Sequence, residues 1–250
     1  MPGATTEYTG PAARPQSVAA CPVTLGRAPR HPGLRAAARQ AACRRTRHYN
    51  HGVNREDIRR RLENSCLAEE TAQGWHLPQV ARPGPAAIPV PAAVLIGLVG
   101  SPEGPEIILT QRTAALRNHP AEISLPGGRV EPGDVSPEAA ALREAAEEVG
   151  LPPESVEILG CLPRYRTVSD YCVYPFVGWI DPPVVFVPDD REVADVFLVP
   201  LQFVLDPANH QRGTVLRDGQ ERGFYVLPFP GRRIWGATAG ILVNLARALG

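Results

Sequence analysis

The stretch from Gly127 to Leu151 constrains this chain more than any other, because it combines a glycine-rich loop with one short helix. Ser136 is a favourable N-cap residue, and Pro137 suits the first helical position, where no backbone N–H is needed. Gly150 is the residue type expected just after the last helical turn. These capping residues predict one helix between Ser136 and Gly150.

The predicted helix has two chemically different sides. Apolar residues recur at i, i+3, i+4 and i+7 on the side that we expect to be buried, namely Leu142, Ala145, Ala146 and Val149. The opposite side carries Glu144, Glu147 and Glu148 within an arc of about 100°. Like charges at these spacings destabilise a helix by about 0.2–0.5 kcal/mol per pair. Arg143 is the only cation in the helix, and the whole chain contains no lysine.

A divalent cation would turn the repulsion among the three glutamates into binding, and carboxylate oxygens suit Mg²⁺ or Mn²⁺. For three glutamates alone, a solvated acidic helix surface would be the better interpretation. The preceding Gly127-Gly128 pair leaves the backbone open to a carbonyl ligand or a close phosphate. This loop, the helix caps and the adjoining Arg143-Glu144 favour the metal site.

Basic residues lie shortly before the glycine loop: Arg112, Arg117 and His119. A guanidinium group binds phosphate through two parallel hydrogen bonds and stays charged at every physiological pH. The three residues could therefore face one phosphate pocket. From spacing alone, a solvated loop explains them equally well.

Composition excludes several classes of protein. The absence of lysine rules out a Schiff-base lysine and a P-loop. Residues 1–54 carry eight arginines and one acid, so the remaining 18 arginines and 25 acids leave the rest of the chain with a net charge of −7. An acidic body disfavours nucleic-acid binding. No apolar run has transmembrane length. Five cysteines without a CxxC pair fit reduced thiols in the cytoplasm better than a disulfide framework or a zinc site.

The chain divides into three segments by composition. Residues 1–52 are rich in Ala, Pro, Gly and Arg, which predicts disorder or sequence upstream of the natural start. A mitochondrial transit peptide is the alternative, but serine is scarce and prolines break any amphipathic helix. Residues 53–91 are expected to form a helix from Asn54 to Leu67 and then a proline-rich connection. Residues 92–250 should form the folded domain.

Hydrophobic patterning predicts further elements in that domain. Strands are expected at 92–99, 106–112, 156–162, 172–180 and 223–229, and helices at 201–205 and 234–249. The first two strands should form a hairpin. Pro175 inside a strand indicates a sheet edge or a bulge. The acidic run from Asp189 to Asp195 could supply a further carboxylate to the metal site, although a solvated turn explains the run as well.

The loop and helix together resemble the Nudix box, whose pattern is G-x5-E-x7-R-E-U-x-E-E-x-G-U with U aliphatic. The second half matches at all fixed positions except the first U, where Ala145 stands; the matching residues are Arg143, Glu144, Glu147, Glu148, Gly150 and Leu151. The first half departs, because the spacing from Gly128 to Arg143 is one residue longer than the pattern and Asp134 stands near its first glutamate. The resemblance implies an α+β fold, the Nudix-type α/β/α sandwich with a mixed β-sheet.

A second resemblance covers the segment before the box. Residues 108–112, Arg117 and Pro126-Gly127-Gly128 are similar to the signature LLTxR(S/A)xxxRxxxGxxxFPGG of coenzyme A diphosphatases within the Nudix superfamily. The spacing agrees throughout, and the residue types differ at Ile108, Thr113, Ala121 and Leu125. If the signature glycine has a positive φ, Ala121 would restrict this loop.

The resemblance implies metal-dependent cleavage of coenzyme A into phosphopantetheine and 3′,5′-ADP. Glu144, Glu148 and Glu147 would hold Mg²⁺ or Mn²⁺, with Glu147, Arg143 and Glu192 as catalytic residues. Substrate-binding residues would be Arg112, Arg117, His119, Gly127 and Gly128, with the two arginines on phosphate, the 3′-phosphate included. The alternatives are a Nudix hydrolase of another nucleotide and a nucleotide-sensing module without catalysis. The expected partner is a small nucleotide, and we expect binding neither to nucleic acid nor to a membrane. The protein should be a monomer or a homodimer. It should be cytoplasmic, or mitochondrial if residues 1–52 are a transit peptide.

Overall fold

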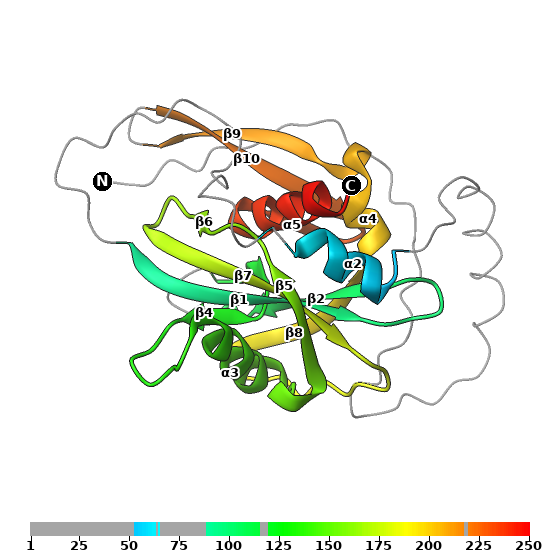
Figure 1. Ribbon diagram of the computed structural model, residues 1–250. Helices are drawn as coiled ribbons and strands as arrows, with labels where there is room; N and C mark the ends of the chain where they lie inside the picture. Colours follow the sequence, from blue (N-terminus) through cyan, green and yellow to red (C-terminus); the bar gives the residue numbers. More distant parts are fainter. Residues whose placement is uncertain (1–52, 64, 66–88, 116–119, 218–219) are drawn as a thin grey trace, which may run out of the picture.

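The computed structural model describes residues 53–63, 65, 89–115, 120–217 and 220–250. Its main element is a mixed sheet of eight strands with the path β3-β2-β1-β7-β5 (Figure 1). The strands on this path are β1 (Val90–Val99), β2 (Glu106–Arg112), β3 (Ile123–Ser124), β5 (Val156–Cys161) and β7 (Tyr171–Ile180). Three more strands pair with them: β4 (Gly127–Arg129) with β1, β6 (Tyr165–Arg166) with β7, and β8 (Val193–Pro200) with β2. Strands β1 and β7 run parallel and all other pairs are antiparallel, so the expected mixed sheet is confirmed.

Helices cover both faces of this sheet. The box helix α3 (Pro137–Val149) lies on one face, while α2 (Arg55–Leu62) and α5 (Gly236–Leu249) lie on the other (Figure 1). Strand β1 divides its side chains between two cores, because successive residues in a strand point to opposite faces. Ala92, Ile96 and Leu98 join the core with α2 and α5, whereas Ala93 and Leu95 join the core with α3. The α/β/α sandwich is thus confirmed.

A second, three-stranded antiparallel sheet packs against α5. It consists of β9 (Gln211–Arg217), β10 (Gln220–Phe229) and β11 (Arg232–Trp235) in the order β11-β10-β9. The short helix α4 (Leu201–Leu205) connects β8 to this sheet through a 3₁₀ turn, Pro207–Asn209, and a similar turn, Pro153–Ser155, precedes β5. Figure 1 shows β9 and β10 as a long hairpin on the α5 side of the molecule. Within the described residues, no helix is long and apolar enough to cross a membrane.

The structure corrects the expected start of the last helix. The helix predicted from residue 234 begins at Gly236, and Ile234 belongs to strand β11 instead. Gly236 turns the chain with a positive φ of 64°, which separates the strand from the helix. The predicted buried residues Ile241, Leu242, Leu245 and Leu249 do face the core.

Strand β7 is not an edge strand, so the interpretation of Pro175 as an edge residue is wrong. Strand β1 pairs with one side of β7, and both β5 and β6 pair with the other. The carbonyl of Pro175 accepts a hydrogen bond from the N–H of Leu162 at 2.9 Å, just after β5 ends and before β6 begins. The nitrogen of Pro175 faces the same side, so its missing N–H falls in the gap between two strands. The alternative expectation is that Pro175 marks a bulge. The irregularity in this pair of strands lies in β5 instead, where the register shifts between Ile158 and Gly160.

Two other expectations are modified. Helix α2 is capped by Asn54 and buries Ile58 and Leu62 as predicted, and the rest of the expected helix, up to Leu67, lies mostly outside the described residues. Cys172 is buried and is not part of a disulfide. Cys161 is disulfide-bonded, so the expectation of reduced thiols is wrong at that position. Residues 1–52 lie outside the described part of the chain.

Candidate active site

Helix α3 has the caps that the sequence predicts. The Ser136 hydroxyl accepts a hydrogen bond from the N–H of Ala139 at 3.1 Å. Gly150 ends the helix in the left-handed conformation, with φ 66°, and its N–H donates to the carbonyls of Ala145 and Ala146. The helix is therefore fixed at both ends, and the side chains of its middle turns keep a defined position above the sheet.

Arg143 connects the helix to the glycine loop. Its guanidinium donates to the Asp134 carboxylate at 3.0 and 3.1 Å and to the Arg129 carbonyl at 3.1 Å. It also contacts Glu144 at 3.0 Å and Glu147 at 3.1 Å. The hydrogen bonds from Arg143 hold the pKa of Asp134 below its usual value, and Asp134 in turn raises the pKa of Arg143. Arg143 thus orients two glutamates of the helix, and Asp134 orients Arg143.

Glu148 lies on the sheet side of the helix, with a side chain that is only 6% exposed. The placement of all three glutamates opposite the buried side is therefore wrong for Glu148. One carboxylate oxygen accepts a hydrogen bond from the N–H of Gly127 at 3.2 Å, and the other lies 3.8 Å from a guanidinium nitrogen of Arg112. Burial raises the pKa of Glu148 to about 7, although the Gly127 N–H and the Arg112 charge oppose this increase.

Glu144 contacts the glycine loop directly. A side chain at Gly128 would place its Cβ only 2.4 Å from an oxygen of Glu144, so only glycine leaves room for this carboxylate. Glu144 is half-buried, and desolvation raises its pKa, with the charges of Glu147 and Glu192 adding to the effect and Arg143 opposing it. The loop backbone and two helix carboxylates therefore share one small volume.

Strands β2 and β8 bring two more predicted residues to this place. Arg112, at the end of β2, lies 3.8 Å from Glu148 and 4.0 Å from Glu192, which immediately precedes β8. The carbonyl of Glu192 accepts a hydrogen bond from the N–H of Thr113 at 2.9 Å, which ties the two segments together. The other two predicted substrate residues, Arg117 and His119, lie outside the described residues.

The role of Asp134 does not follow from its sequence pattern. It stands near the first glutamate of the box pattern, yet its side chain accepts hydrogen bonds from both Arg143 and the N–H of Glu131, the latter at 2.7 Å. Asp134 lies nine residues before Arg143 and outside the helix, so helical spacing does not predict that the two side chains meet. An acidic residue in a glycine loop with an arginine in the next helix is the pattern that could have indicated it.

The donor set fits a hard divalent cation in its chemistry. Five carboxylates gather here against two guanidinium groups, which leaves a net charge of −3 when all of them are ionised; they are Asp134, Glu144, Glu147, Glu148 and Glu192, with Arg112 and Arg143. All available ligand atoms are oxygens, as Mg²⁺ and Mn²⁺ prefer. In the described part of the chain, no three acidic, histidine or cysteine side chains already converge as a ready metal-ligand group. A cation would have to draw the carboxylates closer.

Sequence comparison decides the family. A model of the NUDIX domain matches residues 89–219, which is more than half of the chain and includes the loop, the helix and Arg112. The chain belongs to the Nudix family. Among the curated Nudix proteins, the "Uncharacterized Nudix hydrolase NudL" of Enterobacter sp. (strain 638) is 42% identical over 159 residues, covering 64% of this chain and 82% of the relative. NudL of Escherichia coli (strain K12) is 40% identical over the same length and shares of the two chains.

The similar solved structures have lower sequence identity to this chain. The Nudix hydrolase RenU from M. smegmatis is 24% identical with a TM-score of 0.39, covering 45% of this chain and 71% of its own. A C. elegans Ap4A hydrolase in a binary complex is 23% identical with a TM-score of 0.39, and the match covers 44% of this chain and 80% of that hydrolase. By its family, this chain is a Nudix hydrolase, and the box identified in the sequence is confirmed as part of a Nudix domain.

The loop between β2 and β3 contains a residue with unfavourable backbone geometry. Ala121, which stands where the coenzyme A signature has glycine, adopts φ 58°. A left-handed conformation costs a residue with a Cβ about 1–2 kcal/mol. Glycine avoids this cost, but it loses more conformational entropy on folding, which offsets part of the gain in stability. We expect Ala121→Gly to stabilise the protein by about 0.5 kcal/mol and Ala121→Val to destabilise it by more than about 1 kcal/mol. Denaturant unfolding measures both changes.

The matched control for this prediction is Ala115→Gly, in the same loop and without a positive φ. It should leave stability unchanged or lower it slightly, because only the entropy of the unfolded chain changes. If Ala121→Gly destabilises as much as Ala115→Gly, the left-handed conformation of Ala121 is contradicted.

The buried Glu148 predicts how the stability of the metal-free protein depends on pH. Its pKa is raised in the folded state from 4.5 to about 7, so the folded protein binds this proton more tightly than the unfolded chain does. Its contribution to stability is therefore fully present below pH 4.5 and is lost as pH rises to about 7. One unit of pKa corresponds to about 1.4 kcal/mol, so the loss is at most about 3.5 kcal/mol.

The measurement compares the free energy of unfolding at pH 5 and pH 8 in the presence of a chelator. Glu148→Gln should reduce the stability lost between these two values, whereas Glu138→Gln, at the exposed start of the same helix, should not. An identical pH dependence in wild type and Glu148→Gln would contradict the raised pKa.

Proposed function

We propose that this chain hydrolyses the pyrophosphate bond of coenzyme A or its thioesters, giving 4′-phosphopantetheine or its acyl form and 3′,5′-ADP. The observation that carries the hydrolysis is the packing of Glu144 and Glu148 against the Gly127-Gly128 backbone, with Arg112 beside them. Membership of the Nudix family supports a nucleoside diphosphate derivative as substrate. The signature residues around Arg112, and the φ of 58° at the position of its glycine, support coenzyme A as that derivative.

The proposed metal ligands are Glu144, Glu147 and Glu148. A bound Mg²⁺ or Mn²⁺ would neutralise charge on the pyrophosphate and lower the pKa of a bound water. Arg143 keeps Glu144 and Glu147 in place through its contacts at 3.0 and 3.1 Å, and Asp134 keeps Arg143 in place. Arg112 supplies a permanent positive charge next to Glu148, where it can bind a phosphate oxygen.

Hydrolysis joins the oxygen of water to one phosphorus atom and breaks the bond from that phosphorus to the bridging oxygen, which leaves with the other phosphate. A carboxylate has to accept the proton of the water. Glu147 and Glu192 are suited to this step, because their side chains are 60% and 51% exposed and can exchange protons with solvent. Glu148 is less suited, since it is buried and bonded to Gly127.

A substrate panel with product identification tests the proposal. Coenzyme A, acetyl-coenzyme A, dephospho-coenzyme A, ADP-ribose, NADH and a nucleoside triphosphate are compared by kcat/KM in the presence of Mg²⁺ and of Mn²⁺. The proposal requires coenzyme A or its thioester to rank first, with 3′,5′-ADP as a product. Preference for NADH or ADP-ribose would overturn the coenzyme A assignment and leave a Nudix hydrolase of another nucleotide. Nucleotide binding without any turnover would favour a sensing module.

A further inference from the structure

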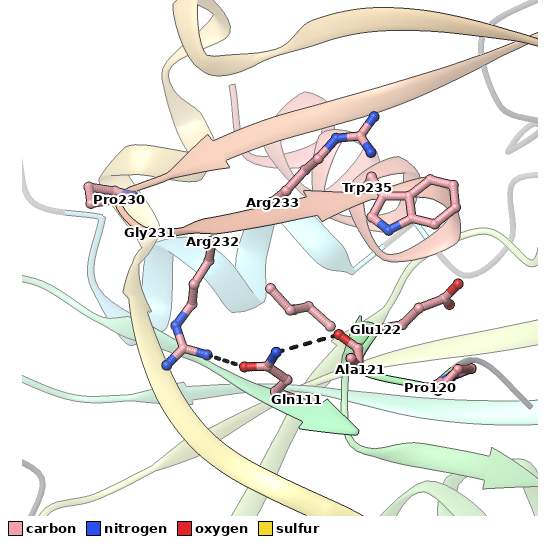
Figure 2. A pocket seen from close by; sticks show the side chains of 10 residues that line it. Gln111, Pro120, Ala121, Glu122, Pro230, Gly231, Arg232, Arg233 and Trp235 are labelled. Carbon is pink, nitrogen blue, oxygen red and sulfur yellow. Dashed lines mark hydrogen bonds between the residues drawn. The ribbon is translucent and has the colours of Figure 1, made fainter. Parts of the chain in front are cut away.

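A cavity of about 720 Å³ lies between the start of β3 and the turn that joins β10 to β11 (Figure 2). Its lining comes from Gln111 of β2, from residues 120–123 and from the segment 230–235. Gln111 and Arg112 are neighbours in β2, and successive side chains of a strand point to opposite faces. Arg112 reaches the carboxylates near α3, so the cavity lies on the other side of the same strand end.

Most polar groups on the inner wall of the cavity are already committed. Arg232 donates to the Gln111 side chain at 3.0 Å, forms an ion pair with Asp195 and lies 3.8 Å from the centre of the Phe197 ring. Gln111 also donates to the carbonyl of Ala121 at 3.5 Å (Figure 2). These contacts hold the wall together, so Arg232 and Gln111 are structural.

Arg233 differs from its neighbour. It is exposed, and within the described residues it has no carboxylate partner. Figure 2 shows Arg232 directed toward Gln111, whereas Arg233 extends from the other side of β11, the side from which the Trp235 ring also extends. The Arg233 guanidinium lies 5.5 Å from the centre of the Trp235 ring and 5.9 Å from that of Phe224. Arg233, Trp235 and the acidic Glu122 all line the cavity, and Arg233 forms no ion pair with any residue that the structure describes.

Trp235 is the second exposed side chain at this cavity, after Arg233. It is 38% exposed, although its ring packs edge to face against Phe224 with the centroids 5.8 Å apart. Tryptophan at the surface is costly unless something covers it, and its flat face suits a nucleobase. Arg233 next to it suits a phosphate, because a guanidinium binds phosphate oxygens in pairs. An indole beside a guanidinium that forms no ion pair within the described residues fits a ligand that has an aromatic base and a phosphate.

We propose that this cavity binds the phosphorylated nucleoside end of the substrate, with the base against Trp235 and the phosphate on Arg233. The inference rests on the proposed function in taking that end to be the 3′-phosphoadenosine of coenzyme A. The end of β2 joins the two places, since Arg112 reaches the carboxylates and the adjacent Gln111 lines the cavity. Chemistry and recognition would then occupy opposite sides of one strand end, and Arg112 would remain with the pyrophosphate.

Two measurements on the full chain test this site. Calorimetry gives the Kd of adenosine 3′,5′-bisphosphate and of AMP, and kinetics gives kcat and KM for coenzyme A and dephospho-coenzyme A. The proteins are wild type, Arg233→Gln, Trp235→Ala, Trp235→Phe and the control Arg60→Gln, which removes an exposed arginine of α2. Circular dichroism checks that Trp235→Ala is folded, and Arg233→Gln changes only an exposed side chain.

Wild type should bind the bisphosphate about tenfold more tightly than AMP, because one charge-assisted phosphate contact has roughly this effect. Arg233→Gln should remove this difference and raise KM for coenzyme A without changing kcat. Trp235→Ala should weaken both nucleotides, Trp235→Phe should restore part of the binding, and Arg60→Gln should change nothing.

Binding of both nucleotides at wild-type affinity in Arg233→Gln and Trp235→Ala would overturn the proposal, and the cluster would then only cover Phe224. The failure of the proposed reaction looks different. If coenzyme A is not hydrolysed but the two Kd values still differ and depend on Arg233, the site stands and the reaction is wrong. If coenzyme A is hydrolysed with unchanged KM in both variants, the reaction stands and the site is wrong.

Discussion

Glu148→Gln is expected to lower kcat/KM by at least about 10³-fold, which corresponds to about 4 kcal/mol of lost transition-state stabilisation. The amide keeps the shape of the side chain and can still accept the hydrogen bond from Gly127, but it removes the negative charge that faces Arg112 and Glu144. Steady-state kinetics with Mg²⁺ measures the loss. The fold should persist, and the metal-free variant should be more stable than wild type at pH 8, because a buried charge has been removed.

Glu138→Gln provides the matched control, because it removes one carboxylate from the same helix at an exposed position away from Arg143 and Glu148. Its activity should equal that of wild type. Glu144→Gln should behave like Glu148→Gln, since Glu144 shares the same small volume. A Glu148→Gln enzyme with nearly wild-type turnover in Mg²⁺ would show that Glu148 does not bind the metal.

Gly128→Ala is expected to reduce kcat/KM by about 10- to 100-fold, the usual effect of displacing a group that orients metal ligands. The new methyl group would lie 2.4 Å from a carboxylate oxygen of Glu144, so that carboxylate must move away from the loop. The obstacle is the flexible end of a side chain, so the free energy of unfolding should change by less than about 1.5 kcal/mol. Kinetics and denaturant unfolding, measured on the same protein, separate the two effects.

Substitutions at two other glycines of the loop serve as comparisons for Gly128→Ala. Gly133→Ala meets nothing within 4 Å, so activity and stability should both stay at the wild-type level. Gly127→Ala meets the Ala93 carbonyl oxygen at 2.3 Å in a backbone with φ 153°, so it should destabilise the protein itself. If Gly128→Ala is as active as Gly133→Ala, Glu144 does not need its present position.

The sequence predicted the parts of the molecule that depend on local rules. The caps at Ser136 and Gly150 gave the helix its boundaries, because satisfying the first N–H groups and last carbonyls of a helix needs only nearby residues. Strands β2 and β10 followed from short apolar runs between turn residues. The extra residue between Gly128 and Arg143 did not disturb the helix, since Asp134 in the loop still reaches Arg143.

What the sequence could not give depends on distant neighbours. Helical periodicity placed Glu148 on the polar side, but β4 inserts beside β1 and its first N–H binds this glutamate, so Glu148 is buried while Glu147 stays exposed. The same limit applies to Pro175, whose place between β5 and β6 is set by strand pairing alone. The approach of segment 230–235 to Gln111, more than a hundred residues away in sequence, left no periodic signal at all.

Strand β1 sends alternate side chains into two cores that do not mix, one under α3 and one under α5. Such a partition gives evolution two sets of positions that can change almost independently, because residues without shared partners contribute additively to stability. Substitutions around α5 and the β10–β11 turn can reshape what the molecule accommodates while the carboxylates near α3 keep their spacing. A one-residue slip of β1 would exchange the two sets at once, so an insertion within this strand should disrupt both cores.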